Sequence, residues 1–114
     1  MDNNGIINSQ FNNYIKLEQN LKYKELYILI NNIVSLLSEL LQESEDIQPY
    51  INSMLNIQSS LKYTAPEIIT NIEIDIYSVI TNLDYKIKNS KKTYSAIYEI
   101  WNKYKSSRFY SVEL

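Results

Sequence analysis

The chain has 114 residues, of which 45% are hydrophobic, and a formal net charge of −2 at pH 7. This length and apolar content predict one globular domain with an ordinary core and exclude a disordered chain. The sequence contains no Cys and no His, which excludes disulfides, thiolate chemistry and the commonest general base and metal ligand. A single Gly and two Pro provide few tight turns, so few, long elements are expected, and these should be helices.

The N-terminus lacks the positive region and the apolar segment of a signal peptide. The most apolar stretch, residues 26–41, is interrupted by polar residues and cannot supply the ~20 apolar residues of a membrane span. We therefore expect a cytoplasmic protein without a transmembrane segment. Residues 1–114 should form a single domain, with residues 1–7 and 109–114 as frayed or loosely docked ends.

The first half of the chain has the pattern of two helices. Phe11, Tyr14 and Ile15 lie on the apolar face expected of a helix near residues 8–21. Around residues 20–24 the apolar positions shift in phase, which predicts a kink or a short break. A helix over 23–43 follows, with an apolar face wide enough for the centre of a bundle. Its apolar positions are Leu26, Leu29, Ile30, Ile33, Val34, Leu36, Leu37, Leu40 and Leu41.

An acidic run separates this segment from a shorter helix over residues 47–61. The run contains Glu43, Glu45 and Asp46, and it lies at the positive end of the next helix dipole. Asp46 is the candidate N-cap of that helix. The connections on both sides of it are only a few residues long, so neighbouring helices should be antiparallel.

The fourth helix is expected over residues 65–88. Thr64 and Glu67 have the spacing of a capping box, and Pro66 falls in the first turn, where its missing N–H costs nothing. The residues around Ile74 also alternate with period two, as in a strand. The longer apolar stripe fits a helix, and no hairpin turn signal lies nearby.

A last helix is expected over residues 91–107, after a polar patch at 88–92 that favours a break. The predicted fold is therefore all-α, an antiparallel bundle of four to five helices. The alternative merges the last two helices into one long helix that pairs with another copy as a coiled coil.

Charge is unevenly distributed along the chain. Residues 1–84 hold 4 Lys or Arg and 11 Asp or Glu, a net charge of −7, whereas residues 85–108 hold 7 and 1, a net charge of +6. The basic segment also contains the single Trp, and Tyr outnumbers Phe by 11 to 2 in the whole chain. Amphipathic aromatic rings are typical of contact surfaces. Residues 85–110 are therefore a candidate basic aromatic face.

The aromatic residues of this face have the spacing of a helix stripe, which fits either a buried core or a contact surface. The basic residues fit a solvated helix face, an acidic partner or a phosphate-bearing one. The candidate partner-binding residues are Lys91, Lys92, Tyr94, Tyr98, Trp101, Lys103, Tyr104, Lys105 and Arg108.

We expect a non-enzymatic protein–protein interaction module, such as a small adaptor, a chaperone or a structural subunit of a larger assembly, which binds an acidic partner or another copy in an oligomer. The alternative is binding of single-stranded nucleic acid or of an anionic membrane surface by the same face. The acidic overall charge and the scarcity of Arg argue against nucleic acid. Capping and solubility explain the carboxylate groups at 43–46 and 73–75, so no catalytic residue, cofactor or metal is expected.

Overall fold

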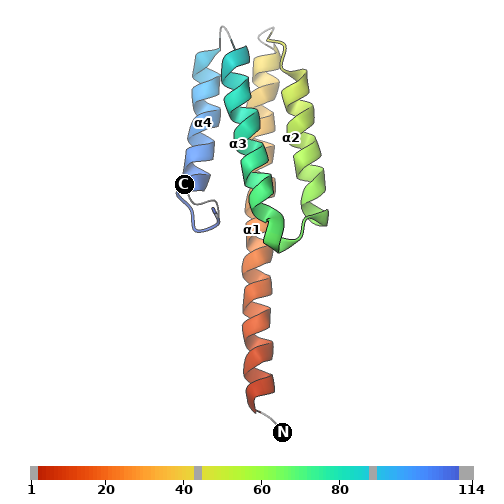
Figure 1. Cartoon of the computed structure of the whole chain (residues 1–114). Helices are drawn as coiled ribbons and strands as arrows, with labels where there is room; N and C mark the ends of the chain where they lie inside the picture. Colours follow the sequence, from red (N-terminus) through yellow and green to blue (C-terminus); the bar gives the residue numbers. More distant parts are fainter. Residues whose placement is uncertain (1–2, 43–44, 88–89, 111–114) are drawn as a thin grey trace.

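The computed structural model describes residues 3–42, 45–87 and 90–110, with the side chains of residues 3–18 left out of the description. The described residues form four α-helices: α1 (Asn3–Gln42), α2 (Gln48–Ser60), α3 (Ile69–Lys86) and α4 (Lys91–Lys105). Two 3₁₀ turns, η1 (Leu61–Tyr63) and η2 (Pro66–Ile68), connect α2 to α3. Figure 1 shows the helices side by side, running alternately up and down. The predicted all-α antiparallel bundle is confirmed.

The helices form a closed ring in which each packs against its neighbours in sequence and α4 returns to α1. The wide apolar face expected in the second half of α1 is buried against both α2 and α4. The buried residues of this face are Leu26, Leu29, Ile30, Ile33, Leu37 and Leu40. A wide apolar stripe thus places α1 in contact with two other helices, as expected from the sequence.

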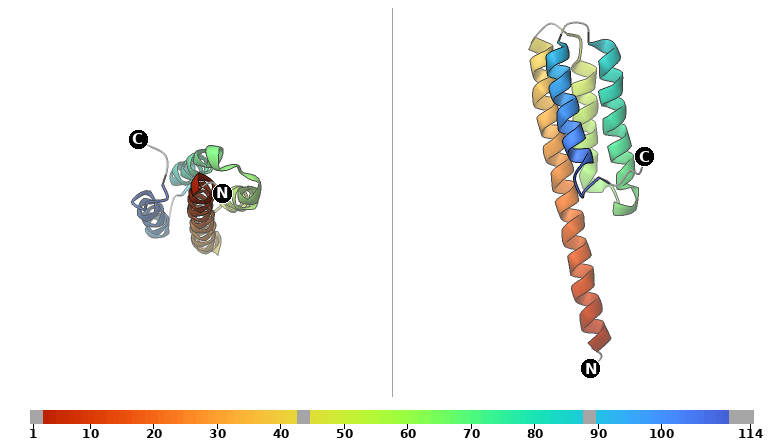
Figure 2. Two further views of the ribbon diagram at one scale, coloured as in Figure 1. Left: turned by 90° about the horizontal axis from the view of Figure 1, so that it is seen from below. Right: turned by 90° about the vertical axis from the view of Figure 1, so that its left-hand side faces the viewer.

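A kink or a short break was predicted at residues 20–24, and the break is wrong: α1 is continuous from Asn3 to Gln42, so the helices expected near 8–21 and 23–43 are one helix. Residues 20–24 contain neither Pro nor Gly, and Leu21, Lys22 and Lys24 are good helix formers. The N-terminal part of α1 extends past the ends of the other helices (Figures 1 and 2). The shift in apolar phase therefore marks the place where α1 leaves the bundle, where its face no longer has to match the core.

The predicted break between α3 and α4 is confirmed, since α3 ends at Lys86 and α4 begins at Lys91. The helical prediction for residues 72–76 is also confirmed: Ile72 and Ile76 are buried, and Ile74 is half-exposed. Residues 88 and 89 of the polar patch lie outside the described residues.

Both predicted N-caps are wrong. The residue before α2 is Ile47, with no side-chain cap, and Asp46 instead lies 3.7 Å from Lys86 in an exposed ion pair. The Thr64 hydroxyl donates to the Ser60 carbonyl, and α3 begins at Ile69, three residues after Pro66. The first turn after Ala65 is a 3₁₀ turn with Pro66 at its start, so the proline position was correctly predicted although the capping box was not.

The two ends of the chain differ. Residues 3–7, expected as part of a frayed lead-in, belong to the first turns of α1. At the other end Phe109 and Tyr110 are partly buried against the core, and residues 111–114 lie outside the described residues. No helix among the described residues is long and apolar enough to cross a membrane.

Candidate functional site

The predicted basic aromatic face is divided between the core and the surface. Trp101 is 1% exposed and Tyr104 is 6% exposed, so both belong to the core, while Tyr94 and Tyr98 are partly buried against it. The cationic members form two groups. Lys91 and Lys92 lie at the N-terminal end of α4, and the second cationic group, Lys103, Lys105 and Arg108, lies at or just after its C-terminal end. These groups are about 17 Å apart at the rise of an α-helix.

This arrangement bears on the stacking that a single-stranded nucleic acid would need. Bases stack on exposed aromatic faces between cationic side chains. Trp101 stacks instead on Tyr77 of α3, with ring centroids 5.9 Å apart and planes inclined by 18°. Its ring also meets the edge of Tyr110 at 5.9 Å. The aromatic stripe is thus used inside the molecule, and stacking of bases on Trp101 would require the bundle to open.

The uneven charge of the sequence is partly neutralised within one chain. Lys86 Nζ lies 3.7 Å from Asp46 Oδ2, and Lys91 Nζ lies 3.2 Å from Asp84 Oδ1. The basic segment therefore contacts the acidic one at the end of the bundle where α1 connects to α2 and α3 connects to α4. Both pairs are exposed and each stabilises the fold by about 0–1 kcal/mol. The second cationic group, at the C-terminal end of α4, lies at the other end of the bundle.

A buried polar cluster joins three helices near that other end. Glu73 of α3 is fully buried, its Oε2 accepts a hydrogen bond of 2.6 Å from the Tyr104 hydroxyl, and its Oε1 lies 3.6 Å from Lys22 Nζ of α1. Burial, followed by the hydrogen bond to Glu73, raises the pKa of Tyr104 far above its ordinary value. Burial lowers the pKa of Lys22, and the charge of Glu73 opposes that shift.

Glu73 corrects the sequence analysis, which assigned it to capping and solubility. The helix pattern did contain the signal, because Glu73 is adjacent to Ile72 and lies between the buried positions Ile69 and Ile76 on α3. A carboxylate at such a position requires polar partners from other helices, and sequence alone does not reveal them. In the acidic run, Glu45 is buried and Asp46 is exposed, while Glu43 lies outside the described residues.

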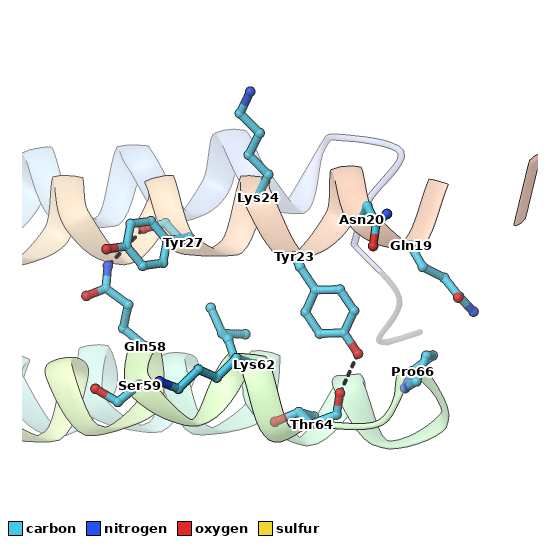
Figure 3. Close-up of a pocket in the computed structure, with 11 residues that line it drawn as sticks. Gln19, Asn20, Tyr23, Lys24, Tyr27, Gln58, Ser59, Lys62, Thr64 and Pro66 are labelled. Carbon is cyan, nitrogen blue, oxygen red and sulfur yellow. Dashed lines mark hydrogen bonds between the residues drawn. The ribbon is translucent and has the colours of Figure 1, made fainter. Parts of the chain in front are cut away.

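A groove of about 820 Å³ lies between α1 and the α2–η1 segment, where α1 leaves the bundle. Figure 3 shows Tyr23 extending from α1 toward Thr64 on the opposite wall, the Tyr27 ring lying alongside α1, and Lys24 directed away from the groove. The Tyr23 hydroxyl donates to the Thr64 carbonyl. Gln58 donates to the Tyr27 carbonyl at 3.2 Å and to Asn31 Oδ1 at 2.8 Å. Two phenol rings and several amide groups give this groove an amphipathic surface.

Comparison with known proteins adds no relative to this description. No protein-family model, no curated protein and no solved structure matches the chain.

Proposed function

We propose that this protein is a non-enzymatic protein–protein interaction module that binds a helix of another chain along the N-terminal part of α1. We call residues 3–18 the arm. The observation that carries the proposal is that the arm extends past the bundle, with no other described element running beside it (Figures 1 and 2). At 1.5 Å per residue the arm is about 24 Å long.

The sequence of the arm fits such a contact. Ile7, Phe11 and Ile15 recur every four residues, the spacing of one face of a helix. In proteins most of the stability of a helix comes from packing of its apolar face against another element. A partner helix that packs along this face would provide that burial, as in other complexes in which an amphipathic helix fits a groove.

The groove at the base of the arm supports the same contact. It begins at Gln19, directly after the arm, and its wall includes Tyr23, Tyr27 and Leu61. Tyr side chains are enriched at protein interfaces because one end of the ring is apolar and the other end forms hydrogen bonds. A partner helix that follows the arm to its C-terminal end would reach this groove at Gln19.

A second copy of the chain is the partner that we propose. Two arms packed antiparallel present the same apolar positions to each other, which gives a symmetric and self-complementary contact. The arm contains Lys16 and Glu18 as its charged residues, so repulsion between two copies is small. An interface of this kind depends little on salt. Contact through the second cationic group (Lys103, Lys105 and Arg108) would be weakened by salt.

The test is the solution mass of the full chain, measured by light scattering behind size exclusion at low and high salt. We expect a dimer at both salt concentrations that Phe11→Asp converts to monomer. Asn13→Asp is the matched control, since it adds the same charge about 200° around the helix and should leave the dimer intact. If the oligomer dissociates at high salt and also in the Lys103→Glu variant, the contact between copies is made by the second cationic group and not by the arm. A monomer under all conditions would contradict self-association.

A further inference from the structure

The buried face of α3 continues through the connection into α4 without a change of phase. From Ile69 to Tyr104, successive members of this face are always three or four residues apart, the spacing of one side of a single helix. Tyr94 is partly buried and the other members are buried. A turn between two helices does not require this continuity, because each helix can rotate separately to face the core. The members are Ile69, Ile72, Ile76, Ile80, Leu83, Ile87, Ser90, Tyr94, Ile97, Trp101 and Tyr104.

The connection between α3 and α4 also lacks the residues that usually stop a helix. The chain has neither Gly nor Pro after Pro66, although Gly commonly ends a helix and Pro commonly follows one. Ile87, directly after α3, has φ −73° and ψ 129°, so its φ is already close to that of a helical residue. Ser90, directly before α4, also has a negative φ, −105°. The sequence of residues 87–90 is therefore compatible with a helix that continues from α3 into α4.

The contacts of α4 can be formed with another copy as well as within one chain. α4 packs more closely against α1 than against α3. Its buried side chains contact fixed positions on α3, since Tyr104 donates to Glu73 and Trp101 stacks on Tyr77. A second copy offers the same surfaces, so α4 of one chain can occupy the α4 position of the other with these contacts kept. Exchange of an identical element is a low-cost route to a dimer for this reason.

We propose that two copies of this chain exchange α4, with α3 and α4 of each copy merged into one helix over residues 69–105, about 55 Å long. In this dimer Tyr104 donates to Glu73 of the partner subunit, and Trp101 stacks on Tyr77 of the partner subunit. α3 ends and α4 begins at the end of the bundle opposite the arm (Figure 1). The two bundles therefore lie end to end with both arms pointing outward. The exchange is independent of the arm, so the two proposals can fail separately.

The ends of the two bundles that meet in this dimer have balanced charges. Lys86 pairs with Asp46 and Lys91 pairs with Asp84, so these residues add no net repulsion between the copies. In the closed chain the short connection holds α4 beside its own α1 at an effective concentration of the order of 1 mM. Exchange should therefore occur when the protein refolds at high concentration, and be slow in the folded protein, where Trp101 would have to leave the core.

The absence of Cys from the chain allows a direct test with two engineered thiols. Ile28 of α1 and Lys103 of α4 are exposed and line the same small cavity between these helices. Ile28→Cys and Lys103→Cys therefore place two thiols within reach of a short bismaleimide. The protein also carries Phe11→Asp, which removes the arm contact proposed above. It is unfolded in urea, refolded at ~1 mM, close to the effective concentration within one chain, and separated by size exclusion.

We expect a dimer fraction in which the bismaleimide links two chains, seen as twice the chain mass on a denaturing gel. In the monomer fraction the link should stay within one chain. Closed chains paired through any surface would also be linked only within each chain, so the gel distinguishes exchange from other dimers. The two single-Cys variants are the control for random linkage and should give no linked chains.

A proline at the first residue of α4 separates the two forms. Lys91→Pro suits the closed chain, because the first N–H groups of a helix have no partner within it, but it falls in the interior of the merged helix. Lys91→Ala is the matched control, since it removes the same ammonium group and favours a helix. We expect Lys91→Pro to lower the ratio of dimer to monomer by more than ~100-fold relative to Lys91→Ala. Both variants should have equal helicity by circular dichroism at ~10 µM, where the closed chain predominates.

Three results would overturn the proposal. They are absence of a dimer after refolding at ~1 mM, a dimer in which the link stays within one chain, and equal dimer fractions in Lys91→Pro and Lys91→Ala. If Lys91→Pro lowers the helicity of the dilute protein, the link between chains decides the proposal alone.

Discussion

Tyr104 of α4 donates a hydrogen bond of 2.6 Å to Glu73 of α3, inside the core and across 31 positions of sequence. The acceptor is a carboxylate that also lies 3.6 Å from the Lys22 ammonium of α1. One buried acidic group thereby connects three helices at the end of the bundle where α1 emerges. Removing any member of this cluster should therefore affect the stability of the whole bundle.

We expect Tyr104→Phe to lower the free energy of unfolding by about 1.5–3 kcal/mol, the usual contribution of a hydrogen bond to a charged group. The ring is retained, so the core keeps its shape. Urea unfolding followed by circular dichroism measures the change. Tyr85→Phe, at a position that is 89% exposed, is the control and should leave stability unchanged. Equal effects of the two substitutions would contradict a stabilising Tyr104–Glu73 bond.

The raised pKa of Tyr104 predicts a loss of stability in alkali. In the unfolded chain this phenol ionises near pH 10, whereas in the folded protein burial and Glu73 keep it protonated to higher pH. Above pH 10 the folded state therefore binds more protons than the unfolded state, and stability falls by up to about 1.4 kcal/mol per pH unit. Lys22 has a lowered pKa and acts in the opposite direction, because the unfolded state then binds the additional proton.

The measurement is the free energy of unfolding at pH 8 to 11 for the wild type and Tyr104→Phe. The other tyrosines ionise in both proteins, so the difference between the two curves reports Tyr104. We expect the stabilising contribution of the hydroxyl to shrink as pH rises above 10. A constant difference over this range would show that the Tyr104 pKa is not raised in the folded state.

The central position of α1 predicts a large cost for a cavity in its buried face. Ile33 is fully buried and Ile28 is 40% exposed on the same helix. Ile33→Ala should lower the free energy of unfolding by about 2–5 kcal/mol, through lost apolar burial and the cavity that remains. Ile28→Ala should cost well under half of that. Thermal and urea unfolding of both variants checks the difference, and similar values would place Ile33 outside the core.

The divided basic aromatic face predicts separate effects for its buried and exposed members. Trp101→Ala should cost about 3–5 kcal/mol and unfold much of the protein at ordinary temperature, since the ring is buried among Tyr77, Tyr104 and Tyr110. Lys103→Glu should leave helicity unchanged, because this side chain is exposed. Circular dichroism of each single variant and of the double variant distinguishes the two roles. A well-folded Trp101→Ala variant would indicate that the ring stabilises the core little.

The bundle could be predicted because periodic apolar positions determine which faces are buried. The stripe from Leu26 to Leu40 and the stripe from Ile69 to Leu83 both proved to be core faces. The phase shift near residue 20 was recognised in the sequence, but its meaning was not, since a helix break and a helix leaving a bundle produce the same local pattern.

The cluster at Glu73 could not be predicted, for a different physical reason. Its partners come from α1 and α4, and pairing between helices depends on their relative rotation and height, which periodicity does not determine. The aromatic stripe of α4 was similarly ambiguous, because a helix face rich in Tyr and Trp has the same spacing whether it is buried or exposed. Burial of Trp101 and Tyr104 resolves that ambiguity in favour of the core.

The extension of α1 past the bundle determines how the molecule rotates in solution. The chain measures 67 × 24 × 19 Å, and the amide N–H bonds of its helices lie close to the long axis. Such bonds are reoriented by end-over-end rotation, which is the slowest rotation of an elongated body. Helical amides should therefore have a higher ratio of transverse to longitudinal ¹⁵N relaxation rates than a compact protein of 13.5 kDa. In a weakly aligned sample, their dipolar couplings should share one sign and be nearly uniform in size.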